Sequence, residues 1–313
     1  MTFDNSDELS KIVKYHPGAK MVLRILTDDS GSLCRLGLKF GAPLGEVRAL
    51  LRKAKELGVV VEGVSFHCGS GCTNPALFGD AVRRARWAFD VGKEEGFDFS
   101  LLDIGGGFED ENFEIIAGVL RPAIEEWFPK AEGVRVIAEP GRYFVSKGFE
   151  LATNIIARRK AREEVVESTG AAFEGVEAME VGEEEEPVVM YYINDGVYGA
   201  FNSIMFDHQV VQPSILTFDD KFHKSDKEVG EEVKWENCSI WGPTCDSIDC
   251  VQANAKLPVG LKVGDWLRWE KMGAYTICAA SQFNGFRKSE VRYTIDTKGD
   301  EEMEKLIRGL IKA

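Results

Sequence analysis

Apolar and polar residues follow two different patterns along the first 145 positions. Short apolar runs predict four buried strands, at residues 21–26, 59–66, 101–104 and 134–138. Apolar positions at helical spacing separate these runs and predict helices over residues 44–57, 74–96 and 113–127. Asn74 and Pro75 supply an N-cap and a first-turn proline for the second helix, which should end near Gly96. Strands that alternate with helices in this way favour one parallel sheet.

The ends of these predicted strands carry polar and small residues. His67 follows the second strand, three glycines at 105–107 follow the third, and residues 139–142 follow the fourth. In a (β/α)8 barrel the carboxyl ends of the strands converge on one face, where the chemistry takes place. Four strands make half of such a barrel, which takes about 250 residues when complete. We therefore expect an α/β fold in which residues 1–146 form the second half of a barrel.

From Lys147 onward the pattern changes to β-branched and aromatic segments with glycine and proline turns between them. These segments predict strands at residues 149–157, 188–193, 233–240 and 265–269. We expect residues 147–313 to form a second, antiparallel β domain. Residues 158–187 contain mixed charges, small side chains and four consecutive glutamates, so they predict a flexible, solvated insertion.

Composition argues against several classes of function. The formal net charge of −14 and the pI near 4.9 argue against a nucleic-acid partner, because such binders present a basic face. No apolar run approaches the length of a membrane helix, so no membrane partner is expected. The seven cysteines form no Cys-x-x-Cys pair, and their odd number favours reduced thiols and a cytoplasmic location. The histidines at 16, 208 and 223 share no ligand spacing with cysteines or acids, so no metal site is expected.

Three consecutive glycines follow Asp103 and Ile104 at the end of the third predicted strand. Bare backbone amides of this kind can curl into a nest that binds an anion, and a phosphate is the natural ligand. A tight turn without any ligand explains the same glycines about equally well. The spacing does not match the dinucleotide-binding glycine motif.

Glu139 and Arg142 lie three residues apart after the fourth predicted strand, so they could simply pair with each other. With a nest on the neighbouring strand, Arg142 becomes a candidate clamp for a phosphate. Glu139 then becomes a candidate partner for the protonated ring nitrogen of pyridoxal phosphate. His67 could stack on that ring while Ser70 bonds the phosphate, although a lone histidine is more often structural.

Two further polar clusters have ordinary explanations when taken alone. Cys245 and Asp246 lie in a turn after Trp241, where a cysteine is usually inert packing. Asp207 follows the apolar residue Phe206, and exposure at the surface is the default interpretation. Neither cluster predicts a site without further support.

Taken together, six motifs resemble those of eukaryotic ornithine decarboxylases in order and approximate spacing, at residues 65–71, 103–108, 139–144, 192–201, 241–246 and 273–286. The resemblance covers essentially the whole chain. Residues 241–246, together with Phe206, Asp207 and His208, point to ornithine rather than to related basic-amino-acid or diaminopimelate decarboxylases. The resemblance implies an alanine-racemase-like barrel followed by a β domain, with pyridoxal 5'-phosphate as the cofactor.

The resemblance also implies roles for individual residues. His67 would stack on the pyridoxal ring, Glu139 would pair with the pyridine nitrogen, and Cys245 would return a proton to the α-carbon of the substrate. The phosphate would be held by Ser70, Gly107, Arg142 and Tyr275, and the cofactor site would also include Gly105, Gly106, Pro140 and Gly141. The terminal ammonium of ornithine would be received by Asp207, next to Phe206, of one subunit and by Asp246 of the other.

A head-to-tail homodimer is implied because the two subunits of such enzymes share their active sites. Lys39 and Asp249 would pair across the interface. The implied reaction converts L-ornithine to putrescine and carbon dioxide in polyamine biosynthesis, and an antizyme-type regulatory protein would be a further partner.

The sequence departs from the family at its start, because residues 1–4 align with an internal stretch of the family. The first barrel strands and the Schiff-base lysine are missing upstream, and no lysine present lies in the motif of that residue. We therefore expect this chain alone to be inactive. A non-catalytic homologue that binds a regulator of polyamine metabolism, and a decarboxylase of another basic amino acid, remain as alternatives.

Overall fold

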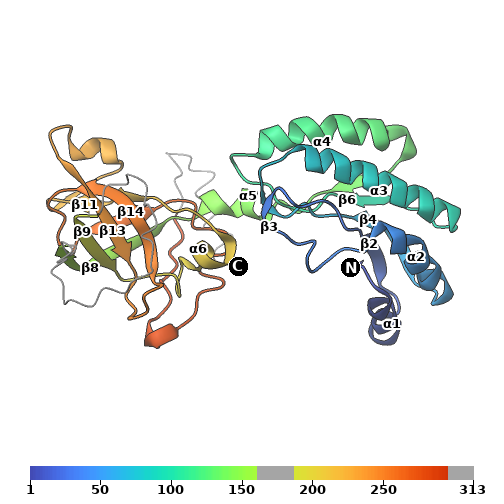
Figure 1. Cartoon of the computed structure of the whole chain (residues 1–313), viewed down its shortest axis with the longest axis horizontal. Coiled ribbons are helices and arrows are strands. Elements are labelled where there is room, and N and C mark those ends of the chain that lie inside the picture. Colours follow the sequence, from blue (N-terminus) through green and yellow to red (C-terminus); the bar gives the residue numbers. More distant parts are fainter. Residues whose placement is uncertain (161–186, 295–313) are drawn as a thin grey trace, which may run out of the picture.

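The computed structural model describes residues 1–160 and 187–294. Two sheets lie in separate parts of the molecule, and the short helix α5 (Gly141–Val145) lies between them (Figure 1). Each sheet has its own cluster of buried apolar side chains. Among the described residues, no helix combines the length and the apolar character needed to cross a membrane.

The first sheet has five strands, all parallel, in the order β1-β2-β4-β6-β7. Their bounds are β1 Thr2–Phe3, β2 Lys20–Arg24, β4 Val60–Ser65, β6 Leu101–Asp103 and β7 Arg135–Ile137. The four predicted strands and their parallel order are confirmed. The fifth, β1, was missed because two residues are too few to show a periodic pattern.

Helices connect the strands of this sheet in sequence: α1 Ser6–Tyr15, α2 Val47–Glu56 after the 3-10 turn η1 Leu44–Glu46, α3 Ala76–Glu94 and α4 Phe113–Trp127. Figure 1 shows α3 and α4 side by side along one side of the sheet. The predicted start of α3 was one residue early, since the helix begins at Ala76. The N-cap is Pro75 and not the predicted Asn74, although the Asn74 side-chain oxygen accepts a hydrogen bond from the Ala76 amide at 3.2 Å.

The core of the first unit forms where the helices place their apolar stripes against the strands. Phe78, Val82 and Ala85 on α3 are fully buried, and α4 contributes Ile116 and Leu120. The central strands approach closely, because a Cβ added at Gly63 on β4 would overlap with the Leu101 carbonyl of β6. Glycine at position 63 therefore sets the spacing of two strands whose ends carry candidate site residues.

The second sheet has six strands in the order β10-β15-β8-β9-β13-β14. The bounds are β8 Leu151–Lys160, β9 Val189–Ile193, β10 Pro213–Ile215, β13 Trp235–Trp241, β14 Cys250–Pro258 and β15 Trp266–Trp269. The expected β domain is confirmed, and four of its five strand pairings are antiparallel; the exception is β9 with β13, which pair in parallel. A long crossover, not a hairpin, joins β9 to β13, so the chain can return in the same direction.

The insertion predicted at residues 158–187 needs a correction at its start. Residues 158–160 continue β8, where Arg158 pairs with Tyr191 of β9 and Arg158 Nη1 bonds the Leu261 carbonyl at 2.5 Å. These contacts hold the strand beyond the predicted boundary. Residues 161–186, on which the rest of that prediction falls, lie outside the described residues.

Smaller elements complete the described chain. They are the paired strands β3 Ser32–Cys34 and β5 Ser70–Cys72, the hairpin of β11 Thr217–Phe218 and β12 Lys221–Phe222, the helix α6 Asn202–Asp207, and the 3-10 turns η2 Lys130–Glu132, η3 Ser146–Gly148, η4 Asp226–Val229 and η5 Phe283–Gly285. In the second core the fully buried Trp269 donates its indole N–H to Thr153 Oγ1 at 2.9 Å and meets Phe201 edge-on.

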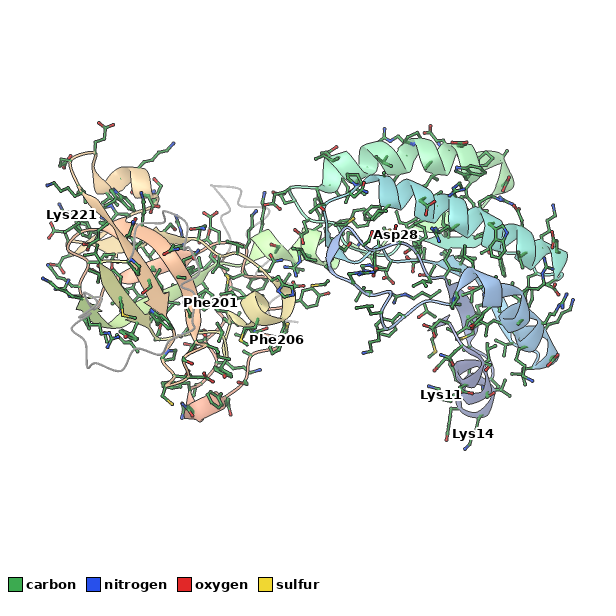
Figure 2. All side chains as sticks on the ribbon, viewed as in Figure 1. Lys11, Lys14, Asp28, Phe201, Phe206 and Lys221 are labelled. Atoms are coloured by element: carbon green, nitrogen blue, oxygen red, sulfur yellow. The ribbon has the colours of Figure 1, made fainter. Side chains whose placement is uncertain are left out.

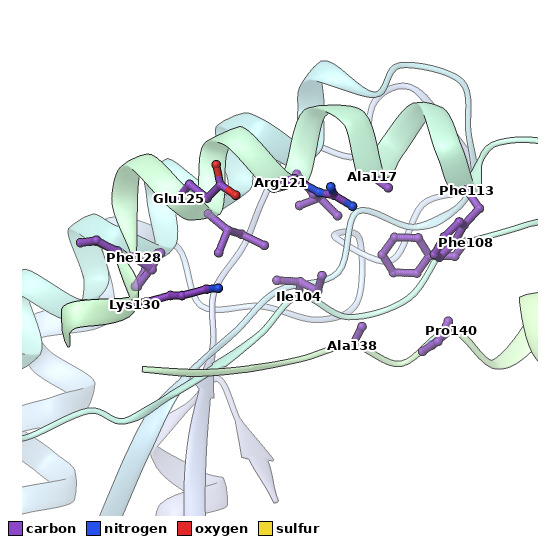
Figure 3. Close-up of a pocket in the computed structure, with 13 residues that line it drawn as sticks. Ile104, Phe108, Phe113, Ala117, Arg121, Glu125, Phe128, Lys130, Ala138 and Pro140 are labelled. Carbon is purple, nitrogen blue, oxygen red and sulfur yellow. The ribbon is translucent and has the colours of Figure 1, made fainter. Parts of the chain in front are cut away.

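A cavity of about 630 Å³ lies between α4 and the segments that follow β6 and β7 (Figure 3). Its walls are mainly apolar side chains such as Ile104, Phe113 and Leu120, with the charged side chains of Arg121 and Lys130 also among them. In the described part of the chain β7 pairs with β6 alone, so the sheet is open on this side. The cavity thus lies at the unpaired β7 edge of the five-stranded sheet, and it is not a polar site.

Leu102 provides a test of the first core, because it is fully buried at the centre of β6 between Val64 and Val136. Leu102→Ala should lower the free energy of unfolding by about 2–5 kcal/mol, through lost apolar burial and a cavity. The matched control is Leu38→Ala at a side chain that is 81% exposed, which should change the stability by less than about 0.5 kcal/mol. Chemical denaturation followed by circular dichroism measures both, and equal effects would contradict the assigned core.

Candidate functional site

The candidate site begins at the carboxyl ends of β4, β6 and β7, which neighbour one another in the sheet. His67 follows β4, the glycine loop of residues 105–107 follows β6, and Glu139 follows β7. Because the three strands are parallel, their ends meet at one edge. The structure therefore brings together three of the features predicted from the sequence.

The glycine loop is enclosed on several sides by backbone. A Cβ added at Gly105 would overlap with the Phe66 carbonyl, and one at Gly107 would overlap with the Gly69 carbonyl. At Gly106 it would lie 2.8 Å from the Glu139 carbonyl and 2.9 Å from His67 Nε2. Gly105 and Gly107 also have φ values of +65° and +92°, which favour glycine. Close packing against the neighbouring strand ends therefore requires glycine here, and the anion-binding nest stays a prediction.

His67 lies beside this loop as a neutral ring. Its Nδ1 accepts a hydrogen bond from the Gly69 amide at 2.9 Å, which leaves the ring proton on Nε2. Burial, assisted by the nearby positive charge of Arg24, lowers the pKa of His67 to about 4. At neutral pH the side chain therefore offers a flat, uncharged surface.

A cluster of charges lies next to the glycine loop. Burial and the negative charge of Asp103 raise the pKa of Glu139, while Arg24 acts in the opposite direction. Asp103 is itself buried, and its Oδ1 accepts the Gly105 amide at 2.9 Å. Burial lowers the pKa of Arg24, and three carboxylates, of Glu139, Asp4 and Asp103, counteract this. Sequence reasoning missed Arg24, although its position at the end of β2 was a signal that could have found it.

Arg142, on α5, has a side chain that is only 9% exposed. It forms an ion pair with Asp207 and lies 3.4 Å from Glu109 Oε1, and its guanidinium stacks 5.1 Å from the Tyr275 ring centre. The simple pairing with Glu139 that the sequence allowed is therefore replaced by two other acids. Glu109 was not predicted, because nothing in the sequence around it indicates that it contacts an arginine beyond the next helix.

Asp207 ends α6, and the default interpretation of it as a surface acid is wrong. Its side chain is 14% exposed and contacts Arg142, while the Cys34 thiol donates to its Oδ1 at 3.3 Å. The neighbouring Phe206, in contrast, is 73% exposed. Figure 2 places Phe206 on the part of the second unit nearer the first, whereas Lys221 lies at the opposite end.

Cys34 belongs to β3 and lies opposite Ser70 of β5. Ser70 is therefore placed beside the same strand whose thiol reaches Asp207. Its neighbour Gly69 has its carbonyl against Gly107 of the glycine loop. The predicted phosphate ligands Ser70, Gly107 and Arg142 are thus linked through short chains of contacts around one region.

Cys245 and Asp246 belong to a second group with different contacts. Tyr198 donates its hydroxyl to Asp246 Oδ2 at 2.5 Å, which raises the pKa of Tyr198 to about 12 and lowers that of Asp246. The exposed Cys245 accepts a hydrogen bond from Asn284 Nδ2 at 3.4 Å. Within one copy of the chain, these contacts do not connect the turn to the glycine loop among the described residues.

Asp249 holds this turn in place. Its carboxylate is 1% exposed and accepts hydrogen bonds from the Val197 amide at 2.9 Å and from Thr244 Oγ1 at 2.6 Å. Lys39 is an exposed side chain whose ammonium lies 4.9 Å from the Phe40 ring centre. Because Asp249 is turned inward and satisfied within its own chain, the pairing of Lys39 with Asp249 across an interface stays a prediction.

The first group of residues consists of His67, the glycine loop of residues 105–107, Glu139 and Arg142. These residues fit a ligand with an anionic end and a planar ring. Close packing leaves no space for a side chain at residues 105–107, so a ligand that reached this loop would meet bare backbone. Arg142 supplies a cation beside this region, and neutral His67 supplies a flat face. Glu139, with its raised pKa, can exchange a proton with a basic ring nitrogen. The fold and the site thus define an α/β protein suited to a phosphorylated, planar cofactor.

Comparisons with known proteins place this class more closely. Residues 1–146 match the family model of the pyridoxal-dependent decarboxylase pyridoxal binding domain, and residues 87–273 match that of the C-terminal sheet domain. The chain therefore belongs to the pyridoxal-dependent decarboxylases. Its two units also confirm the expected fold, a partial barrel followed by a β domain.

Individual relatives agree with this family. The chain is 48% identical to the ornithine decarboxylase of Schizosaccharomyces pombe over 95% of its own length and 62% of the relative, and 49% identical to that of Rattus norvegicus over 94% and 60%. It thus spans about 60% of these relatives. It is also similar to the crystal structure of the Paramecium bursaria Chlorella virus arginine decarboxylase bound to agmatine, with a TM-score of 0.78, 34% identity, and coverage of 94% of this chain and 71% of that one.

Gly107→Ala tests the glycine loop. The new methyl group would overlap with the Gly69 carbonyl, and the φ of +92° is unfavourable for alanine, so the loop must shift. We expect affinity for inorganic phosphate to fall about tenfold or more, which isothermal titration calorimetry measures. Gly118→Ala on α4 is the control, because its Cβ would meet nothing within 4 Å, and its affinity should stay unchanged. Unaltered binding by Gly107→Ala would argue that phosphate binds elsewhere.

The lowered pKa of His67 predicts how stability depends on pH. At pH values between the ordinary pKa of 6.5 and the lowered pKa of about 4, His67 is protonated in the unfolded chain but not in the folded chain. The free energy of unfolding should therefore fall as the pH is lowered through this range, by up to about 3 kcal/mol from this group. His67→Gln should flatten that dependence, measured by urea unfolding at pH 4.5 and 7. The exposed His16→Gln is the control, and an identical pH dependence in both variants would refute the assignment.

Proposed function

We propose that this chain forms most of the active site of a pyridoxal-phosphate-dependent ornithine decarboxylase, which converts L-ornithine to putrescine and carbon dioxide. The observation that carries the proposal is the glycine loop at 105–107, enclosed by His67 and Glu139 with Arg142 nearby. The similarity to ornithine decarboxylases over 94–95% of the chain supports the choice of substrate.

The cofactor would be held by the first group of residues. In the proposal Arg142, Ser70 and the amide of Gly107 bind the phosphate, with Tyr275 completing that end. The backbone of Gly105, Gly106, Pro140 and Gly141 forms the floor, His67 covers one face of the ring, and Glu139 holds a proton at the ring nitrogen. When bound, pyridoxal phosphate supplies an electron sink for the electrons left behind when carbon dioxide departs.

The substrate would be held by acids from both groups of residues. Ornithine carries a terminal ammonium, and in the proposal Asp207, beside Phe206, and Asp246 receive it from two sides. Asp246 is kept anionic by the Tyr198 hydroxyl, which lowers its pKa. Cys245, next in the chain and exposed, would deliver the proton of its thiol to the α-carbon.

We also propose a homodimer, because the candidate residues fall into two separate groups. Asp207 contacts the first group within one copy, whereas Cys245 and Asp246 lie on a separate, partly exposed turn. In the proposal a second copy presents that turn to the first, and Lys39 and Asp249 meet across the interface if the Asp249 carboxylate turns outward. We further propose residues 1–146 and 147–313 as the two domains, a cytoplasmic location, and an antizyme-type protein as a regulatory partner.

Two other candidates have some support. The chain is 45% identical over 99% of its length to a Xenopus laevis protein named antizyme inhibitor 2, which favours a regulatory role. The complete set of Cys245, Asp246, Asp207 and Arg142 instead favours an enzyme. Similarity to a viral arginine decarboxylase and to a lysine/ornithine decarboxylase from Vibrio vulnificus, at 26% identity and a TM-score of 0.73, keeps other basic amino acids as alternatives.

A chimaera tests the proposed activity. Residues 1–313 replace the matching part of the Schizosaccharomyces pombe relative, which supplies the remaining 38% of its own length. We expect this protein to release putrescine and carbon dioxide from L-ornithine in preference to L-lysine and L-arginine. Cys245→Ala in the chimaera should slow putrescine formation about 100-fold and leave cofactor absorbance unchanged.

The matched control is Cys278→Ala, which removes another exposed thiol and should keep full turnover. A folded chimaera that binds pyridoxal phosphate and yet prefers lysine or arginine would refute ornithine as the substrate. One that binds the cofactor without any turnover would favour the regulatory role, and full turnover by Cys245→Ala would defeat the assignment of the proton donor.

A further inference from the structure

Arg142 is enclosed by two carboxylates and little water. Its side chain is 9% exposed, and those of Asp207 and Glu109 are 14% and 23% exposed. Arg142 Nη2, Asp207 Oδ2 and Glu109 Oε1 are all inaccessible to solvent. One positive and two negative charges thus give this buried cluster a net charge of −1. A cluster with this charge repels the phosphate that Arg142 is proposed to bind.

A phosphate monoester carries a charge between about −1.5 and −2 at neutral pH. Its oxygens cannot lie against Arg142 while both carboxylates remain, because like charges at contact distance in a buried site repel strongly. One carboxylate must therefore leave the guanidinium when the anion arrives. The surroundings of the two acids determine which one it is.

Glu109 is tied to the glycine loop. Its amide donates to Asn112 Oδ1 at 2.8 Å, and Asn112 Nδ2 donates to the Gly107 carbonyl at 3.2 Å. The two acids that follow it form ion pairs of their own, Asp110 with Lys147 and Glu111 with Lys271. This segment is therefore fixed at several points.

Apart from its pair with Arg142, Asp207 is held by the Cys34 thiol, and its neighbours in α6 form no ion pair among the described residues. It ends a helix of six residues, its neighbour Phe206 is 73% exposed, and the following residue, His208, has a φ of +52°. A cavity of about 340 Å³ borders α6, with Arg142, Ser203 and the segment 209–214 in its walls. Open space therefore lies beside Ser203 of α6 and beside the segment that follows Asp207.

We propose that Asp207 and a phosphate compete for Arg142, so that a bound phosphate displaces the Asp207 carboxylate from the guanidinium. The displaced carboxylate becomes available to a cationic ligand. The same movement releases the Cys34 thiol, which lies opposite Ser70. The identity of the cation rests on the function proposed above, whereas the exchange of carboxylate for phosphate at Arg142 does not.

This exchange couples two ligands. A phosphate that frees Asp207 raises the affinity for a diamine, and by linkage the diamine raises the affinity for phosphate by the same factor. The site therefore loads in a preferred order, with the anionic end of the cofactor before the cationic end of the substrate.

Asp207→Asn is the first test, carried out on the 313-residue chain with inorganic phosphate as the probe. Removing the competing charge should tighten phosphate binding about tenfold or more in calorimetric titrations. Asp220→Asn makes the same change in the hairpin of β11 and β12, at an exposed position with a φ of +59° that asparagine adopts readily, and should bind phosphate as the parent chain does. Equal affinity in the two variants would overturn the proposal.

The second test needs no variant, so it stands even if Asp207→Asn fails to fold. The dissociation constant of putrescine is measured for the parent chain with and without saturating inorganic phosphate. We expect phosphate to tighten putrescine binding about fivefold or more. Unchanged or weaker binding would overturn the coupling. Neither test involves turnover, so a chimaera without decarboxylase activity would refute the proposed function and leave this exchange standing.

Discussion

The buried guanidinium of Arg142 is the interaction on which the rest of the site depends. A cation with a side chain that is 9% exposed must be matched by anions, and the chain supplies Glu109 from the first unit and Asp207 from the second. Arg142 itself lies on α5, between the two sheets (Figure 1). The need to neutralise Arg142 therefore fixes where the β domain meets the parallel sheet. The ion pairs of Lys147 with Asp110 and of Lys271 with Glu111 also join residues of the two parts.

Close approach of backbone is the second constraint. The carbonyls of Phe66, Gly69 and Glu139 surround the loop of residues 105–107 so tightly that no side chain fits on it. The same closeness removes water from His67, whose pKa falls for that reason. Backbone geometry and the protonation state of the site thus have one physical origin, which is the convergence of parallel strand ends.

Much of this could be predicted from local pattern. The periodic apolar stripe of α4 gave its bounds correctly, and the residues after three predicted strands do meet. What could not be predicted depends on partners far away in the sequence. Nothing in the local sequence of β9 or β13 indicates that the two strands pair in parallel, because the same residues could form a strand running in either direction. Glu109 and Cys34 lie in no motif, and their importance comes from Arg142 and Asp207, which are 33 and 173 positions further along the chain.

Two candidate site residues are exposed to solvent within one copy of the chain. Tyr275 is 58% exposed and Cys245 is exposed, although the proposed phosphate ligand and the proposed proton donor would work best away from water. Asp249 and Tyr198 nevertheless hold the Cys245 turn in a defined shape through short hydrogen bonds. A turn that is rigid before it is covered loses little conformational entropy when a partner surface arrives. This favours the proposed arrangement in which each copy completes the site of the other.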